Sequence, residues 1–303
     1  MLMILLQETP PIPFDFEATA RAHGWAALRP FEWDAASLTL SRVHRLDSGQ
    51  VVRLRLSEGR VNGSAPFVEI SVETVEPLTA IAEVQIRRAV RRMLRLDEDL
   101  SEFYDLCAQN ENWLLRVKPG GGRLLRCPTL FEDIVYTLCT TNITWAGTKR
   151  LVDRLTERLG EPFPGQAEWR TFPTPAAIAA AGPDFLRQEI RLGYRSGYMA
   201  DLATAVAEGR LDLAGMEDPT LPTPELLRRL RQIKGVGPYA AATLLMILGR
   251  YEHLAVDTEL VGHVSKKYFG GQPASEAEMR AIYAPWGKWQ YLAYWFDPPV
   301  TDC

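Results

Sequence analysis

A Gly-Val-Gly turn at residues 235–237 and an aspartate, Asp257, have residue types and a spacing that could support chemistry. The two glycines allow a sharp backbone turn and a close approach of the backbone to a ligand. Pro238 follows the turn, and proline is favoured at the first position of a helix. Backbone N–H groups at the start of that helix would point outward, so the sequence predicts a site for an anion such as a phosphate.

Both features also have a plain structural interpretation. A Gly-Val-Gly segment can be an ordinary turn between two helices, and an Asp at the start of a helix usually serves only as its N-cap. A dinucleotide-binding loop is excluded, because such a loop follows a strand and the residues before Gly235 have a helical pattern. The signal lies in the combination of the turn, the helix after it and a carboxylate eighteen residues after Tyr239.

Three predicted helices would position these residues. The first begins at Pro224 and carries an apolar stripe of Leu226, Leu227, Leu230 and Ile233. The second is the apolar run from Ala240 to Leu248, and the third covers 258–268, directly after Asp257. Residues 223–270 hold seven Lys or Arg against four acids, although the whole chain has a formal net charge of −4.

The rest of the chain predicts an α+β fold. Segments 38–46, 51–56 and 68–73 alternate apolar and polar residues, as in an antiparallel sheet with one solvated face, and the apolar N-terminus favours another strand or a packed arm over a signal peptide. A loop or linker at 119–122 precedes a region, from Pro128, whose pattern is helical almost to the end. The predicted domains are 1–118, a sheet with a helix, and 119–303, all helical. The helix in the first domain covers 78–96, with an apolar face of Ile81, Val84, Ile86, Val90, Met93 and Leu94.

The composition narrows the class of protein. The 47% apolar and 24% charged residues are typical of a soluble globular protein, and no apolar run approaches the ~20 residues that span a bilayer. The cysteines form no CxxC pair, which argues against a structural zinc site or a four-cysteine iron–sulfur cluster and favours free thiols in a reducing cytoplasm. They are Cys107, Cys127, Cys139 and Cys303.

The segment LRQIKGVGPYAAATLLMILG and the later AVDTE resemble the hairpin and aspartate of the helix-hairpin-helix (HhH-GPD) DNA glycosylase superfamily. The segment 139–145 (CTTNITW) resembles the Cys-Ser-Ser-Asn segment of 8-oxoguanine DNA glycosylases, and 192–198 (LGYRSGY) and 286–295 resemble two further helices of the superfamily. The N-terminal strands and helix resemble the TBP-like sheet domain of AlkA-type 3-methyladenine and 8-oxoguanine glycosylases. The resemblance covers residues 14–297, most of the chain.

This resemblance implies a base-excision-repair enzyme that flips a damaged base out of duplex DNA and hydrolyses its N-glycosidic bond. Asp257 would be the catalytic carboxylate, which stabilises the positive charge developing on the sugar and orients a water molecule. Asn142 would fill the gap left by the flipped base, with a local turn or cap as its alternative role. The hairpin residues that would bind DNA are Lys234, Gly235, Val236, Gly237, Tyr239 and Ala240. Candidates for an aromatic base pocket, for each of which core packing is the default, are Trp145, Tyr239, Trp289, Tyr294 and Trp295.

Tyr239 distinguishes two kinds of chemistry within the superfamily. Members that also nick the strand place a Lys two residues after the second hairpin glycine, where its amine forms a Schiff base with the sugar. This chain has Tyr239 there, and Lys234 lies before the first glycine, so the resemblance implies a monofunctional glycosylase. Tyr294 stands where 8-oxoguanine enzymes carry a Gln, and an aromatic pocket suits cationic alkylated bases. Alkylated purines of the 3-methyladenine type are therefore the expected substrates.

Three alternatives remain open: an 8-oxoguanine glycosylase with or without lyase activity, a catalytically weak module that binds damaged DNA, and an unrelated helical scaffold. The expected partner is double-stranded DNA with a damaged base, and no membrane. The expected state is a cytoplasmic monomer, associated with the nucleoid if the source is bacterial. No cofactor or catalytic metal is expected, although hairpin carbonyls near Lys234–Gly237 could hold a monovalent cation next to a DNA phosphate.

Overall fold

The computed structural model describes residues 1–60, 66–110, 113 and 117–297. Its chain forms two compact units, each built from two segments. Unit 1 comprises Met1–Glu98 and Arg123–Ala214, and unit 2 comprises Asp99–Gly122 and Gly215–Cys303. The domain division at residues 118 and 119 stays a prediction. Among the described residues, no helix has the length and hydropathy needed to span a bilayer.

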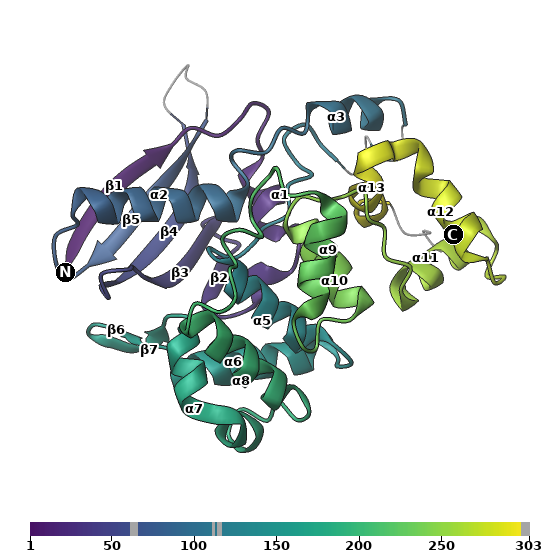
Figure 1. Cartoon of the computed structure of the whole chain (residues 1–303). Helices are drawn as coiled ribbons and strands as arrows, with labels where there is room; N and C mark the ends of the chain where they lie inside the picture. Colours follow the sequence, from purple (N-terminus) through teal and green to yellow (C-terminus); the bar gives the residue numbers. More distant parts are fainter. Residues whose placement is uncertain (61–65, 111–112, 114–116, 298–303) are drawn as a thin grey trace. The chain divides into compact units, whose positions relative to one another are not determined.

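Unit 1 contains a five-stranded antiparallel sheet in the order β1-β5-β4-β3-β2 (Figure 1). The strands are β1 Leu2–Glu8, β2 Phe31–Asp34, β3 Thr39–Arg45, β4 Val51–Gly59 and β5 Phe67–Thr74. Leu54 on β4 lies opposite Val72 on β5, and both side chains are fully buried, as the alternating pattern predicts. The predicted strands are confirmed. The segment 62–65 (NGSA), whose residue types favour a turn between strands, lies outside the described residues.

Helix α2, Ala80–Leu94, lies across one face of this sheet (Figure 1). It begins where the Thr79 hydroxyl accepts a hydrogen bond from the N–H of Ala82 (3.2 Å). The predicted apolar face is wrong at Ile81 and Val84, which are 72% and 65% exposed. At 3.6 residues per turn these two positions lie away from the face that packs on the sheet. The buried members of the predicted face are Ile86, Val90, Met93 and Leu94.

Helix α5, Leu130–Thr140, is almost completely buried, including two carboxylates in its first turn. Glu132 accepts two parallel hydrogen bonds from the guanidinium of Arg42 on β3 (3.1 and 3.0 Å). Asp133 accepts hydrogen bonds from the indole N–H of Trp25 (3.1 Å) and a guanidinium N–H of Arg92 (2.9 Å). These paired charges connect the sheet, α2 and α5, and so fix the start of the helix that leads to Asn142.

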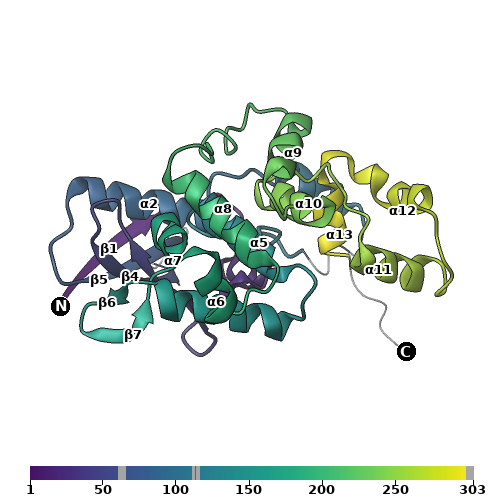
Figure 2. The same cartoon turned by 60° about the horizontal axis from the view of Figure 1, so that its bottom comes forward.

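The remaining helices of unit 1 are α6 Trp145–Leu159, α7 Pro175–Gln188 and α8 Arg195–Ala207, which group beside α5 (Figure 2); a short helix, α1, covers Phe16–Arg21. The region after Pro128 is not entirely helical, because a hairpin of β6 (Pro162–Phe163) and β7 (Gln166–Arg170) interrupts it. Pro162 and Pro164 disfavour a helix, and Gly165 adopts the left-handed conformation of the turn (φ +83°). Trp169 on β7 lies under the guanidinium of Arg53 on β4.

Unit 2 is helical in its described part. Its helices are α3 Ser101–Ala108, α9 Thr223–Gln232, α10 Pro238–Ile247, α11 Thr258–Tyr268, α12 Glu276–Tyr283 and α13 Gln290–Trp295, with a 3-10 turn at Ala284–Trp289. Phe103 on α3 packs its ring on Trp286 and Trp289 (centroids 5.8 and 5.7 Å apart). The indole N–H of Trp113 donates to the carbonyl of Ala293 (2.8 Å). Residues from the first segment of unit 2 thus complete the core under its last helices.

His23 makes the stability of unit 1 depend on pH. Its residue is 6% exposed, and its ring packs at a tilt of 53° against Trp25, with the ring centroids 4.2 Å apart. Burial, followed by the charge of Arg95, lowers the pKa of His23 to about 4. Because this folded-state pKa is below that of the unfolded chain, stability is fully present above pH 6.5 and is lost as the pH falls towards 4. The loss should reach about 2 kcal/mol at pH 5, at ~1.4 kcal/mol per pKa unit.

Denaturant unfolding at pH 7 and pH 5 measures this loss. His23→Asn places its side-chain amide where Nδ1 lies, 3.2 Å from the carbonyl of Leu125, and has no titratable ring. The variant should lose clearly less stability than the wild type between the two pH values. An equal loss in both proteins would assign the acid sensitivity to other groups.

Candidate functional site

The predicted hairpin is present between α9 and α10. Gly235 has φ +87°, which glycine adopts without strain, whereas Gly237 has φ −79°. The first backbone bond of α10 runs from the N–H of Ala241 to the carbonyl of Gly237 (2.9 Å). The N–H groups of Tyr239 and Ala240 precede that bond and have no acceptor within the helix. Together with the positive end of the helix dipole they can bind an anion.

The residues of the hairpin differ in their exposure to solvent. Lys234, Gly235 and Gly237 are exposed, and Tyr239 is 40% exposed. Val236 and Ala240 are buried, so their side chains attach the turn to the core and only their backbone can meet a ligand. The carbonyls of Ile233 and Gly235 already accept the N–H groups of Val236 and Gly237, and each keeps a second lone pair. A monovalent cation there therefore stays a prediction.

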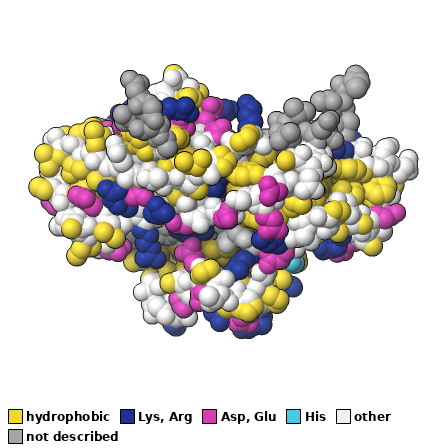
Figure 3. All heavy atoms as spheres, turned by 90° about the horizontal axis from the view of Figure 1, so that it is seen from above, with side chains coloured by type: hydrophobic (Ala, Val, Ile, Leu, Met, Phe, Trp, Pro, Cys, Tyr) yellow, Lys and Arg dark blue, Asp and Glu magenta, His cyan; other side chains and the backbone are white. Residues whose placement is uncertain are grey.

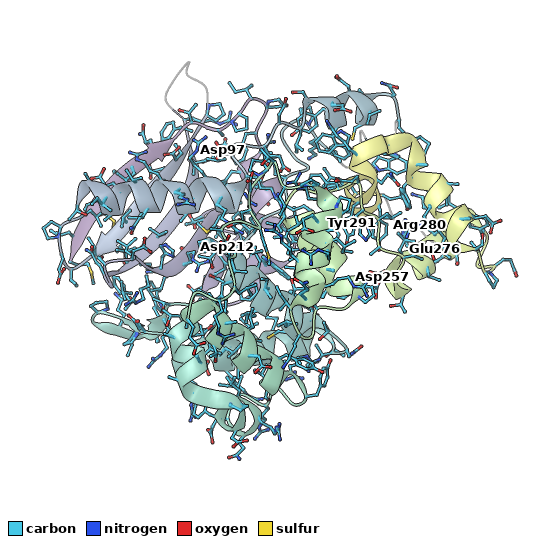
Figure 4. All side chains as sticks on the ribbon, in the orientation of Figure 1. Asp97, Asp212, Asp257, Glu276, Arg280 and Tyr291 are labelled. Carbon is cyan, nitrogen blue, oxygen red and sulfur yellow. The ribbon has the colours of Figure 1, made fainter. Side chains whose placement is uncertain are left out.

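Backbone-directed contacts hold the segment between α10 and α11. The guanidinium of Arg250 donates to the carbonyls of Asp218, Pro219 and Leu221 (3.1, 3.0 and 3.0 Å), which fixes the approach to α9. Arg280 on α12 donates to the carbonyl of Leu254 (2.9 Å). These hydrogen bonds position the residues just before Asp257. Figure 4 labels Asp257, Arg280 and Tyr291.

Asp257 is the N-cap of α11, as predicted. Its Oδ1 accepts the N–H of Leu260 (2.9 Å), which fixes the orientation of a half-buried carboxylate. Its Oδ2 has no hydrogen-bond partner among the residues that the structure describes, so this oxygen is available to a ligand. A catalytic role for Asp257 stays a prediction.

The charge of this carboxylate acts on two tyrosines of α13 in unit 2. Burial, followed by the negative charge of Asp257, raises the pKa of Tyr291 and of Tyr294. The two rings are 5.9 Å apart, edge to face, and Tyr239 contributes to the same electrostatic environment. Of the predicted pocket residues, Tyr294 therefore lies within the electrostatic influence of Asp257, and Tyr239 lies within that of Tyr294. Tyr291 was missed, although it precedes Tyr294 by three residues and so lies on the same face of α13.

The two predicted tryptophans of unit 2 differ. Trp295 is 38% exposed on α13. Trp289 is 6% exposed and stacks on Tyr251 (5.7 Å, 25°), besides its contact with Phe103. Trp289 has the surroundings of a core residue, and its part in a pocket stays a prediction that rests on the sequence resemblance alone.

Asn142 and Trp145 belong to unit 1, whereas the hairpin and Asp257 belong to unit 2. Asn142 is exposed with φ +48°, and its side-chain amide donates to the hydroxyl of Tyr194 (3.1 Å). Arg195 donates to the carbonyls of Leu138 (3.1 Å) and Thr141, so the turn that carries Asn142 is held from α8. Trp145 is the first residue of α6 and is 44% exposed. Tyr194, within the segment that resembles a family helix, was not among the predicted site residues.

The surface charge is mixed, so an anion site must be local. On the face seen in Figure 3, Lys and Arg are interspersed with Asp and Glu. The formal net charge of −4 would repel a polyanion at long range. Within the described part of the chain, no three His, Cys, Asp or Glu side chains form a group that could hold a metal ion.

The two hairpin glycines should respond differently to substitution by alanine. A Cβ at Gly237 would meet no atom within 4 Å, so Gly237→Ala should keep its stability. That Cβ would occupy the space where a phosphate approaches, and we expect binding to damaged and undamaged DNA to weaken about tenfold. Gly235→Ala forces a side chain to φ +87° and should lose about 1–2 kcal/mol of stability.

Fluorescence anisotropy measures the DNA affinity of the two glycine variants, and denaturant unfolding measures their stability. If Gly237→Ala weakened binding to damaged DNA alone, that result would contradict a phosphate site.

Comparisons with known proteins find DNA glycosylases among the proteins similar to this chain in sequence and in fold. No protein-family model matches the chain. It is 24% identical over 178 residues to DNA-3-methyladenine glycosylase 2 of Escherichia coli (strain K12), an alignment that covers 58% of this chain and 60% of the relative.

Two solved structures are similar over 97% of this chain. The 3-methyladenine DNA-glycosylase from Archaeoglobus fulgidus superposes with a TM-score of 0.74 at 21% identity, over 97% of its own length. The 8-oxoguanine glycosylase/lyase of Clostridium acetobutylicum, in its apo-form, superposes with a TM-score of 0.66 at 16% identity, over 94% of its length. The resemblance found in the sequence is confirmed at the level of the fold, which this chain shares with these two DNA glycosylases.

Proposed function

We propose that this protein is a monofunctional DNA glycosylase that removes alkylated purines of the 3-methyladenine type from double-stranded DNA by hydrolysis. The observation that carries the proposal is the Asp257 carboxylate. It is oriented by α11, it follows the hairpin of α9 and α10, its Oδ2 is available, and its charge acts on Tyr291 and Tyr294. The E. coli relative and the Archaeoglobus fulgidus structure, both named for 3-methyladenine, support this class of lesion.

Each group has a defined task in this proposal. The N–H groups of Tyr239 and Ala240 bind a phosphate without reading the sequence. The nucleotide rotates out of the stack, which costs a few kcal/mol, and Asn142 fills the gap. Oδ2 of Asp257 stabilises the positive charge that develops on the sugar as the bond to the base breaks, and orients the attacking water. The leaving base packs against Tyr239 and Tyr294, whose ring faces attract the positive charge of an alkylated purine.

Tyr239 supports hydrolysis without strand cleavage. A phenol cannot form the Schiff base through which a Lys amine would carry out lyase chemistry. The product would therefore be an intact strand with an abasic site. We also propose that the protein acts as a monomer in the cytoplasm, which size-exclusion chromatography with light scattering and cell fractionation would test.

The test is base release from duplexes that carry 3-methyladenine, hypoxanthine or 8-oxoguanine, each analysed with and without alkali. The proposal expects release of the alkylated base and strand breakage only after alkali. Breakage without alkali, or trapping of the protein on DNA by borohydride, would contradict a monofunctional enzyme. Absence of release from every duplex would leave a module that binds damaged DNA.

A second candidate is an 8-oxoguanine glycosylase. The fold shared with the Clostridium acetobutylicum 8-oxoguanine glycosylase/lyase favours it. Tyr294 in place of a Gln counts against it, because a phenol offers one hydroxyl for the edge of the base where an amide offers a donor and an acceptor. Preferential release of 8-oxoguanine in the same assay would move this candidate to first place.

A further inference from the structure

A buried carboxylate, Asp297, joins three helices of unit 2. The residue is 4% exposed, and its two oxygens accept four side-chain hydrogen bonds. Oδ2 accepts from Nε2 of His263 (2.7 Å), the hydroxyl of Tyr268 (2.9 Å) and the hydroxyl of Tyr283 (2.7 Å). Oδ1 accepts from the ammonium of Lys267. Every donor is a side chain, so the arrangement depends on residue types and not on the backbone alone.

These donors come from the elements that form the candidate site. His263, Lys267 and Tyr268 are on α11, whose first residue follows Asp257. Tyr283 is the last residue of α12, the helix whose Arg280 holds the segment before Asp257. The carboxylate therefore fixes α11 against α12 behind the candidate catalytic residue.

The same carboxylate holds the rings around Tyr294. The ring of Tyr294 packs edge to face on His263 (5.9 Å) and on Tyr283 (5.8 Å), both of which donate to Asp297. The N–H of Asp297 donates to the carbonyl of Tyr294 (3.1 Å), which fixes its backbone as well. Two sides of the Tyr294 ring and its backbone thus depend on one carboxylate.

Stability alone is a poor explanation for such a cluster. Burying charged groups carries a desolvation cost, and well-packed apolar side chains often stabilise a core as well or better. A fully hydrogen-bonded polar network does something that apolar packing does less well: it specifies one arrangement of its members. A pocket wall requires one arrangement, because a misplacement of about 1 Å can cost a hundredfold in rate.

We propose that Asp297 is a positioning residue of the glycosylase site. It acts through His263 and Tyr283 on Tyr294, and through α11 on Asp257, without touching the DNA itself. The inference rests on the proposed function, to which it adds a residue that sets the geometry of the base pocket.

The first experiment separates positioning from stability. Asp297→Asn keeps the shape of the side chain and removes the negative charge that pairs with the ammonium of Lys267. Asp297→Asn combined with Lys267→Met removes that ammonium and should recover much of the lost stability. We expect single-turnover release of an alkylated base to be about tenfold to a hundredfold slower in both variants, with DNA binding within about twofold of the wild type.

Ser275→Ala is the matched control. Ser275 and Glu278 form the capping box at the start of α12, so the variant destabilises the same unit at a site away from the pocket rings. It should lower the midpoint of unfolding and leave the rate of base release within about twofold. A double variant that regains the rate together with its stability would overturn the proposal. So would a Ser275→Ala variant that is slowed as much as Asp297→Asn.

A second measurement does not depend on any lesion. Incorporated 3-fluorotyrosine gives a ¹⁹F NMR signal for Tyr294, assigned by its loss in Tyr294→Phe. The proposal expects this signal to shift or split in the double variant and to stay unchanged in Ser275→Ala. An unchanged signal in the double variant would overturn the positioning role. A wild type without base release would refute the proposed function, and the ¹⁹F signal would still decide whether Asp297 positions Tyr294.

Discussion

Asp257→Asn should reduce base release by about a thousandfold, which corresponds to ~4 kcal/mol of lost transition-state stabilisation. The amide keeps a carbonyl oxygen that can accept the N–H of Leu260, and Asn is as good an N-cap as Asp. The start of α11 should therefore persist, and only the charge facing the sugar disappears. Single-turnover release measures the effect, together with binding to the same duplex and denaturant unfolding, both of which should be unchanged.

Asp15→Asn is the matched control for this substitution. Oδ1 of Asp15 caps α1 in unit 1 by accepting the N–H of Ala18 (2.8 Å), so the same chemical change occurs at the same kind of position. This variant should release bases at the wild-type rate. Turnover that persists in Asp257→Asn would mean that another group stabilises the transition state, and the catalytic assignment would have to be abandoned.

Arg42→Met should have the largest effect on stability, about 3–5 kcal/mol. The side chains of Arg42 and Glu132 are 2% and 4% exposed, so the substitution leaves a buried carboxylate without its counter-charge. The hydroxyl of Tyr136 lies 3.2 Å from Glu132 but closer to the carbonyl of Arg29 (2.6 Å), so its single proton does not replace a bidentate guanidinium. Urea or guanidinium unfolding of unit 1 measures the loss.

The double variant Arg42→Met with Glu132→Leu tests the reason for that loss. With both charges removed, the site can pack as an apolar core, and most of the stability should return. A double variant that is less stable than Arg42→Met would show that the ion pair itself stabilises the fold, and that desolvation of an unpaired charge is not the cause.

The sequence predicted the elements whose signals are local. Alternation gave β3, β4 and β5, and Pro238 with the two glycines gave the hairpin and the start of α10. Asp257 could be placed at a helix start because capping involves residues within one turn. Each of these features depends on residues within a few positions in the chain, and such local patterns can be read from the sequence.

The features that were missed depend on distant partners. The β6–β7 hairpin has little alternation, and its Trp169 is placed by Arg53, more than a hundred residues earlier. His263 and Lys267 share a helix face at a spacing of four, yet nothing in that spacing shows that Asp297 lies between them. Ile81 and Val84 fit an apolar pattern, but which face of α2 packs on the sheet is decided by tertiary contacts.

The path of the chain between the two units limits how the protein can be divided. Residues 99–122 belong to unit 2, although the rest of that unit begins only at residue 215. A fragment that starts at residue 119 would lack Phe103 and Trp113, whose rings pack on Trp286, and would leave Trp289 with the ring of Tyr251 but without that of Phe103. Neither unit can be obtained by cutting the chain once, because each is interrupted by the other. During synthesis, α3 leaves the ribosome well before the last helices of unit 2, which lie about 180 residues further along the chain. The apolar face of α3 therefore stays uncovered until those helices have been synthesised.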